Sequence, residues 1–104
     1  MRFPFTDLAS TKLRPCAVWA AHGEDIVVLG LFSRVPLGTL RRTWVLIEDR
    51  HAQFHSTGLK QTSLLRAEKI AVLHRSVFQR KLGDLPPALM ASAERALKAA
   101  LHIS

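Results

Sequence analysis

The stretch CAVWAAHGEDIVVLGLF, residues 16–32, places two apolar runs on either side of a short polar turn. The runs CAVWAA (16–21) and DIVVLGLF (25–32) have the length and the valine and isoleucine content of β-strands. Between them, His22-Gly23-Glu24 supplies a glycine that tolerates the positive φ of a tight turn. The stretch therefore predicts an antiparallel hairpin, from which the rest of the fold can be built outward.

Downstream, where apolar residues again predominate, we predict a strand at residues 43–47 and one strand or a pair of short strands at residues 64–73. The segment RVPLGTLRR (34–42) before the first of them contains a proline, a glycine and three arginines, a composition typical of an exposed loop. Residues 48–62 show no sustained periodicity of apolar residues and end in turn-forming residues. We therefore expect a basic loop and a second irregular segment on the two sides of the third strand.

The C-terminal third changes to helical patterns. SVFQRKLG (76–83) has a serine followed three residues later by a glutamine, and it ends on a glycine, which predicts one short helix. In PPALMASAERALKAAL (86–101), an apolar stripe predicts a longer helix that packs on the sheet. The stripe consists of Leu89, Ala93, Leu97 and Leu101. Strands followed by helices favour an α+β domain, a small and strongly curved sheet or barrel closed by the C-terminal helix.

The composition limits the cellular setting. A chain of 104 residues predicts a single domain over residues 1–104. Its longest apolar run, residues 26–32, is too short to cross a bilayer, and the N-terminal MRFPFTD lacks the apolar region of a signal peptide. The cytoplasm is the expected compartment.

Cys16 is the only cysteine, which excludes an internal disulfide and a cysteine-based zinc site and favours a small core residue.

The charge points to a polyanionic partner. Fifteen Lys and Arg against eight Asp and Glu give a net charge of +7, and these basic residues are spread along the chain. Such a distribution indicates a broad electropositive surface and makes nucleic acid a plausible partner, although many basic proteins are simply solvated in this way.

Five short motifs occur in a characteristic order. They are FPFTD (3–7), KLRP (12–15), GLK (58–60), SLLRAEKI (63–70) and RKLG (80–83), followed by a helical segment. In this order and at these spacings the sequence resembles the MazF/PemK family of toxins from bacterial toxin–antitoxin pairs. The resemblance implies a small SH3-like, CcdB-like β-barrel with a short helix and a C-terminal helix packed on it.

The family resemblance also implies a function. It implies a homodimeric endoribonuclease that cleaves single-stranded RNA, including mRNA, at short sequences by attack of the 2′-hydroxyl. The reaction would need no metal or other cofactor, and a cognate antitoxin would neutralise the protein.

Arg66 and Glu68 are the first candidate catalytic residues. In a strand, side chains two residues apart share a face, so both are expected to reach one phosphodiester. A carboxylate suits removal of the 2′-hydroxyl proton, and a guanidinium suits the charge that grows on the phosphoryl oxygens. The alternative is an ordinary exposed ion pair on a strand. By the resemblance, Arg14 of KLRP adds phosphate binding and transition-state stabilisation; the alternative for Arg14 is a solvated turn residue.

The sequence departs from the family pattern at two places. Where the third strand of the family usually ends in a Thr-Ser or Thr-Ala step, this chain has Phe32-Ser33-Arg34, so Ser33 alone offers a replacement hydroxyl. Family members also carry a Gly-Asp-led strand before FPFTD, whereas only Met1 and Arg2 stand there. Either the start of the chain is assigned too late or that strand is truncated, which would expose a sheet edge.

An RNA groove is expected along the basic loops 10–14, 34–42 and 50–60. The residues expected to bind RNA are Lys12, Arg34, Arg41, Arg42, Phe54 and Lys60, with Phe54 as a base-stacking residue in a polar loop. Trp19 and Trp44 lie in apolar runs and are expected in the core.

The histidines are weaker candidates. His51 and His55 have the spacing of metal ligands on a helix, but neither a helix nor a third ligand is indicated, so no metal site is expected. His22 or His55 could supply the acid that protonates the leaving oxygen.

Two functions of other classes stay open. One is a catalytically impaired relative that only binds RNA or an antitoxin. The other is a toxin that acts on a protein target such as DNA gyrase, because one fold can serve several activities.

Overall fold

The computed structural model describes residues 4–8 and 15–103. In these residues six strands form one antiparallel sheet in the order β4-β5-β3-β2-β1-β6. The strands are β1 Pro4–Leu8, β2 Pro15–His22, β3 Asp25–Phe32, β4 Trp44–Ile47, β5 Ser63–His74 and β6 Phe78–Asp84. The helical elements are the 3₁₀ turns η1 Phe54–Thr57 and η2 Arg75–Val77 and the α-helix α1 Pro87–Ala100.

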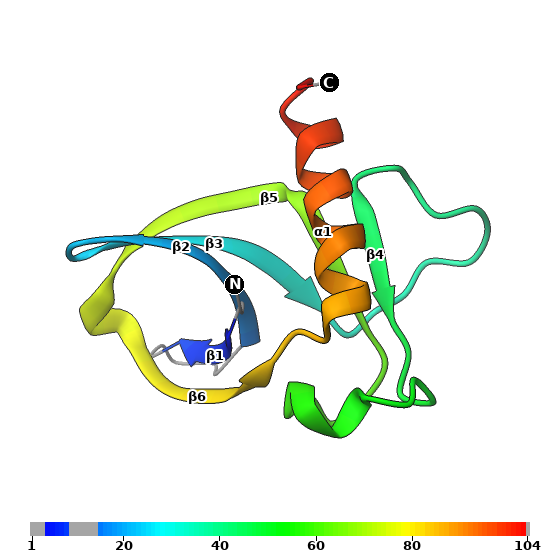
Figure 1. The fold of residues 1–104 in the computed structure, drawn as a ribbon, viewed down its shortest axis with the longest axis horizontal. Coiled ribbons are helices and arrows are strands. Elements are labelled where there is room, and N and C mark those ends of the chain that lie inside the picture. The colour runs from blue at the N-terminus through cyan, green and yellow to red at the C-terminus, as the bar shows by residue number, and fades with distance from the viewer. Residues whose placement is uncertain (1–3, 9–14, 104) are drawn as a thin grey trace.

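The β2–β3 hairpin forms as the sequence predicts, and Gly23 has the positive φ of 63° that its turn requires. The sheet curls strongly: β5 runs along one side of the hairpin, and η2 returns the chain as β6 toward β1 (Figure 1). β1 pairs with β2 on one edge and with β6 on the other. The expected curved sheet is therefore confirmed.

β5 contains a bulge that matters for the site. Leu29 of β3 pairs with Ile70, but the next residue, Gly30, pairs with Arg66, so residues 67–69 have no counterparts on β3. The amide of Ala67 instead donates to the carbonyl of Thr43, 2.8 Å away, just before β4. Bulges of this kind bend a strand and redirect its side chains.

α1 stands across β4 and β5 and covers one face of the curled sheet (Figure 1). Its alanines Ala93 and Ala96 are fully buried against Leu29, Leu65 and their neighbours, because small side chains let the helix approach the sheet closely. Leu89 and Leu97 pack at the edge of this core, as expected. Leu101 does not continue the stripe: it follows the last helical residue and is 49% exposed.

The short helix predicted over residues 76–83 is wrong. The chain makes one 3₁₀ turn at η2 and then continues as β6, whose backbone pairs with β1. Gly83 does not end a helix: a Cβ there would lie 2.2 Å from the carbonyl oxygen of Ser56, so glycine is needed for η1 to pack against β6. Local signals favoured a helix, but strand pairing with β1 decides the conformation.

Candidate functional site

Arg66 lies at the centre of a cluster that spans three adjacent strands. It is directly opposite Trp44 of β4 on one side and Gly30 of β3 on the other. Cross-strand neighbours lie about 5 Å apart, so the three residues share one small area of the sheet. Arg66 is thus part of a larger arrangement than the ordinary exposed ion pair considered as the alternative.

Two aromatic rings hold the Arg66 guanidinium. Its carbon lies 5.1 Å from the centre of the Trp44 ring and 5.4 Å from the centre of the Phe32 ring, distances typical of cation–π contacts. Gly30 makes the second contact possible. A Cβ at Gly30 would lie 2.8 Å from Cε2 of Phe32, so the ring occupies the space that any other side chain would need.

Glu68 fixes the same guanidinium from another direction. Its Oε2 accepts hydrogen bonds from Nε of Arg66 at 2.9 Å and from Nε1 of Trp44 at 3.1 Å, and it lies 2.8 Å from Nη2 of Arg66. The prediction that Arg66 and Glu68 meet on one face is confirmed by this geometry. Both side chains remain 29% exposed, so solvent or a ligand still reaches them.

Glu68 has a strongly shifted pKa. Burial by itself would raise the pKa of this carboxyl. The hydrogen bonds from Trp44, from the backbone of Glu68 itself, from Arg66 and from Thr43 act in the opposite direction and together lower the pKa from 4.5 to about 2. The carboxylate is therefore ionised throughout the physiological range and binds a proton only weakly.

Arg66 keeps the capacity to bind an anion. A guanidinium has five N–H donors, and the bonds to Glu68 use the donors on one side only. The remaining donors can meet phosphate oxygens in the fork geometry that arginine favours. An arginine held by a carboxylate and two rings has its orientation set before any ligand arrives.

The basic loop 33–43 ends beside this cluster. Ser33, Arg34, Arg41 and Arg42 are all exposed, as predicted. The guanidinium carbon of Arg41 lies 5.3 Å from the centre of the Trp44 ring, and the turn that brings it there is closed by a 3.0 Å bond from the Trp44 amide to the Arg41 carbonyl. Two guanidinium groups, those of Arg41 and Arg66, therefore lie next to the Trp44 ring.

Other predicted residues lie elsewhere. Lys12 and Arg14 fall outside the described residues. Pro15, which follows Arg14, begins β2, and Cys16, which is buried as expected, pairs with Gly30. Lys60 is exposed after η1.

The structure reverses the positions expected for Phe54 and Trp44. Phe54 is half-buried at the start of η1 and packs against the hydrophobic core, whereas Trp44, expected in the core, has its ring next to two guanidinium groups. Trp19 packs against the core as expected. The sequence did not indicate that Trp44 belongs to the cluster. Its membership follows from its pairing opposite Arg66, and a single sequence does not give strand register.

The histidines are dispersed. His51 accepts a 3.1 Å hydrogen bond from the Gln53 amide through Nδ1, while His22 and His55 are exposed. Among the residues that the structure describes, no group of three or more His, Cys, Asp or Glu side chains is placed to hold a metal ion. In the same part of the chain no helix is long and apolar enough to cross a membrane.

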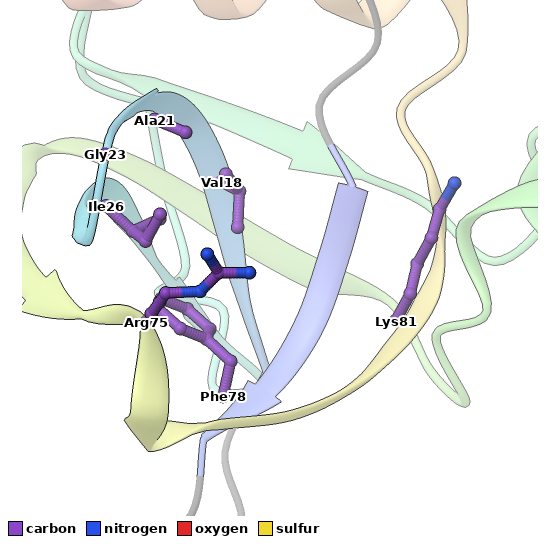
Figure 2. Close-up of a pocket in the computed structure, with 7 residues that line it drawn as sticks. All are labelled: Val18, Ala21, Gly23, Ile26, Arg75, Phe78 and Lys81. Carbon is purple, nitrogen blue, oxygen red and sulfur yellow. The ribbon is translucent and has the colours of Figure 1, made fainter.

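A pocket of about 440 Å³ lies apart from the cluster, between the β2–β3 hairpin and the start of β6. Figure 2 shows Arg75 beside the Phe78 ring, with its guanidinium directed toward Val18, and Lys81 on the opposite side of β1. The remaining lining residues are Ala21, Gly23 and Ile26. This mainly apolar pocket contains none of the residues around Arg66.

Solved structures share the fold of this chain. No family model matches the sequence, and no curated protein matches it. Among solved structures, the Mycobacterium tuberculosis toxin MazF-mt6 superposes with a TM-score of 0.79 at 17% identity, over 97% of this chain and 98% of that one. The chain has the fold of the MazF toxins. The resemblance found in the sequence and the expected α+β class are thereby confirmed.

Two further MazF-like structures come from mycobacterial species. An endoribonuclease in complex with its cognate antitoxin has a TM-score of 0.72 at 22% identity, over 99% of this chain and 93% of that one. An endoribonuclease from mycobacterial species has a TM-score of 0.71 at 21% identity, over 94% of this chain and 88% of that one. The similarity extends over nearly the whole MazF fold.

Proposed function

We propose that this protein is a toxin-type endoribonuclease that cleaves single-stranded RNA. The observation that carries the proposal is the Arg66 guanidinium, held by Glu68, Trp44 and Phe32 on a partly open surface of a MazF-like sheet. The solved neighbours named endoribonucleases support the same activity class. The net charge of +7 suits a polyanionic substrate.

In the proposed reaction the 2′-hydroxyl attacks the adjacent phosphorus. The P–O bond to the 5′-oxygen breaks, leaving a 2′,3′-cyclic phosphate and a 5′-hydroxyl, and no metal takes part. Solvent water accepts the proton of the 2′-hydroxyl and supplies the proton that the 5′-oxygen takes up. Arg66 stabilises the charge that grows on the phosphoryl oxygens, with Arg14 as the second cation and Ser33 as the hydroxyl that replaces the usual threonine.

Glu68 has a different role from the proton acceptor proposed from the sequence. A general base works best when its pKa lies near the working pH, and a carboxylate with a pKa of about 2 is a weak base. Its two contacts with Arg66 suit a positioning residue that aims the guanidinium. We therefore assign Glu68 to orientation of Arg66.

The proposed partners are a cognate antitoxin and a second copy of the chain. The antitoxin follows from the solved endoribonuclease that forms a complex with its own antitoxin. The homodimer is supported by exposed apolar side chains on β5 and after α1. These are Ile70, Val72, Leu101 and Ile103.

The test is incubation of the purified protein with a long single-stranded RNA in EDTA, followed by mapping of the fragment ends. The proposal predicts cuts at short sequences that leave 5′-hydroxyl ends, and loss of these cuts in Arg66→Ala. Arg95→Ala is the matched control, because Arg95 is exposed on α1 and bonds Ser92, outside the cluster and outside the expected RNA-binding loops. RNA that is bound but not cleaved would instead support an impaired relative, in which Phe32 has replaced the catalytic threonine.

A further inference from the structure

Trp44 is a half-buried tryptophan on a charged surface. Its N–H is engaged by Glu68, and its ring lies next to the guanidinium groups of Arg66 and Arg41. A tryptophan used only for packing would not need two cations at its ring. This arrangement presents an aromatic face in a strongly positive environment, the combination on which nucleic-acid bases stack.

The two arginines at the ring differ in how firmly they are held. Arg66 is bonded to Glu68 and has strand neighbours on both sides. Arg41 is exposed in the loop 33–43, and its guanidinium makes no hydrogen bond or ion pair with any residue in the described part of the chain. An exposed cation–π contact is weak, so Arg41 is easily displaced from the ring.

We propose that Trp44 is a stacking platform for one base of a single-stranded RNA, and that the base takes the place of Arg41 on the ring. The displaced Arg41 then pairs with a phosphate of the same strand. This inference rests on the proposed function, because it places the base next to the phosphate bound by Arg66. It concerns base binding, which the cleavage chemistry does not require.

The charges favour a nucleic acid over a peptide as the occupant. The loop 33–43 contains three arginines within nine residues, Arg34, Arg41 and Arg42. A single strand carries one negative charge per nucleotide and can therefore pair with several of them at once. An aromatic side chain of a peptide would also stack on Trp44 but would bring no anion for the displaced Arg41.

The first experiment measures the fluorescence of Trp44 in a Trp19→Phe background, where it is the only tryptophan. The probe is a DNA hexanucleotide, which lacks the 2′-hydroxyl and is not cleaved, and binding is followed in parallel by anisotropy. An abasic hexanucleotide of the same charge is the control. We expect the normal oligonucleotide to quench Trp44 on binding and the abasic one to bind more weakly without quenching.

The second experiment needs no change at Trp19. It compares the affinities of the normal and abasic oligonucleotides for Trp44→Leu and Trp44→Phe. Stacking predicts that Trp44→Leu weakens binding of the normal oligonucleotide roughly 5- to 150-fold more than binding of the abasic one, which loses only the contribution of the ring to holding Arg66. Trp44→Phe keeps an aromatic face and should retain most of the difference between the two probes.

Neighbouring arginines provide a matched pair of variants. Arg41→Ala and Arg42→Ala each remove one positive charge from the same exposed loop, but only Arg41 contacts the Trp44 ring. Arg42→Ala should weaken both oligonucleotides by the same factor. Arg41→Ala should weaken the abasic oligonucleotide more than the normal one, because it also uncovers the ring.

The outcomes separate this inference from the function on which it rests. Binding of both oligonucleotides with equal affinity and no quenching of Trp44 would overturn the stacking platform while leaving an RNA-binding enzyme. A Trp44→Leu variant that loses both probes equally would also overturn it, because this result indicates a structural role. Failure of the parent protein to bind any single strand would overturn the platform and the proposed function together.

Discussion

Arg66 illustrates how neighbouring side chains fix the orientation of one residue. An exposed arginine on a strand is mobile and contributes little to binding one phosphate. Here Glu68 bonds one side of the guanidinium and two aromatic rings lie against it, so its orientation is set before a ligand arrives. Preorganised charge is the main way in which a site without a metal stabilises a phosphoryl transition state.

The Glu68 carboxylate predicts a pH-dependent stability. Its folded pKa of about 2 lies below the ordinary 4.5, so the ionised form stabilises the fold above about pH 4.5. This contribution is lost as the pH falls from about 4.5 toward 2. Urea unfolding should therefore show that Glu68→Gln is clearly less stable than the parent at about pH 6, with the difference shrinking toward about pH 2.

Glu48→Gln is the control for that titration. Glu48 pairs with Arg50 at the surface, and exposed pairs contribute about 0–1 kcal/mol. Its unfolding free energy should stay close to that of the parent at both pH values. A Glu68→Gln variant as stable as the parent at about pH 6 would show that the carboxylate is not held as the structure has it.

At the scale of the element, β3 and the bulge in β5 build the site together. Gly30 leaves room for the Phe32 ring, and the bulge at residues 67–69 interrupts the regular pairing beside Arg66. Gly30→Ala should destabilise the protein by about 1–3 kcal/mol, because overpacking forces the ring away from its position. It should also slow RNA cleavage, since Arg66 loses its contact with Phe32.

A double-variant comparison locates the cause of that loss. In a Phe32→Leu background the main clash is gone, so Gly30→Ala should cost much less in urea unfolding. Gly23→Ala is the matched control, because a Cβ there meets nothing within 4 Å and its cost of about 1 kcal/mol comes only from the positive φ of 63°. An unchanged cost of Gly30→Ala in the Phe32→Leu background would contradict the proposed packing.

The sequence predicted the elements whose conformation is decided by their own residues. The hairpin at 16–32, the strand at 64–73 and the C-terminal helix follow from apolar patterning and turn residues. β6 could not be predicted, because its conformation depends on pairing with β1 and on the close approach of η1 to Gly83.

The same division holds for the site. Arg66 and Glu68 were predictable because they are two apart in one strand. The role of Phe32 was not predictable, because the family resemblance indicated only that Phe32 replaces a threonine. Its contact with Arg66 exists because Gly30 has no side chain and lies beside it in space.

At the scale of the whole molecule, the exposed apolar residues of β5 predict self-association. Val72 is 62% exposed and Ile70, two residues earlier on the same face, is 39% exposed. Apolar surface of this kind on a sheet favours an interface between protein chains. Light scattering should show that the parent is a dimer and that Val72→Asp shifts it toward the monomer.

Leu37→Asp is the control for the dimer, because Leu37 is fully exposed in the loop 33–43 and is not part of β5. It introduces the same charge and should leave the dimer intact. A parent protein that is monomeric at micromolar concentration, or a Val72→Asp variant that dimerises as well as the parent, would contradict an interface on β5.

The central claim is that a fixed Arg66 guanidinium performs the catalysis, and chemical rescue tests it most directly. Arg66→Ala should lower kcat for a short single-site RNA in EDTA by about 10²- to 10³-fold. The side chains of Glu68, Trp44 and Phe32 remain in this variant and leave a space that a free guanidinium ion can occupy. Free guanidinium at non-denaturing concentration should restore part of the rate, and should restore none in Arg66→Ala/Glu68→Gln. Cleavage by Arg66→Ala at the parental rate, without added guanidinium, would contradict the account.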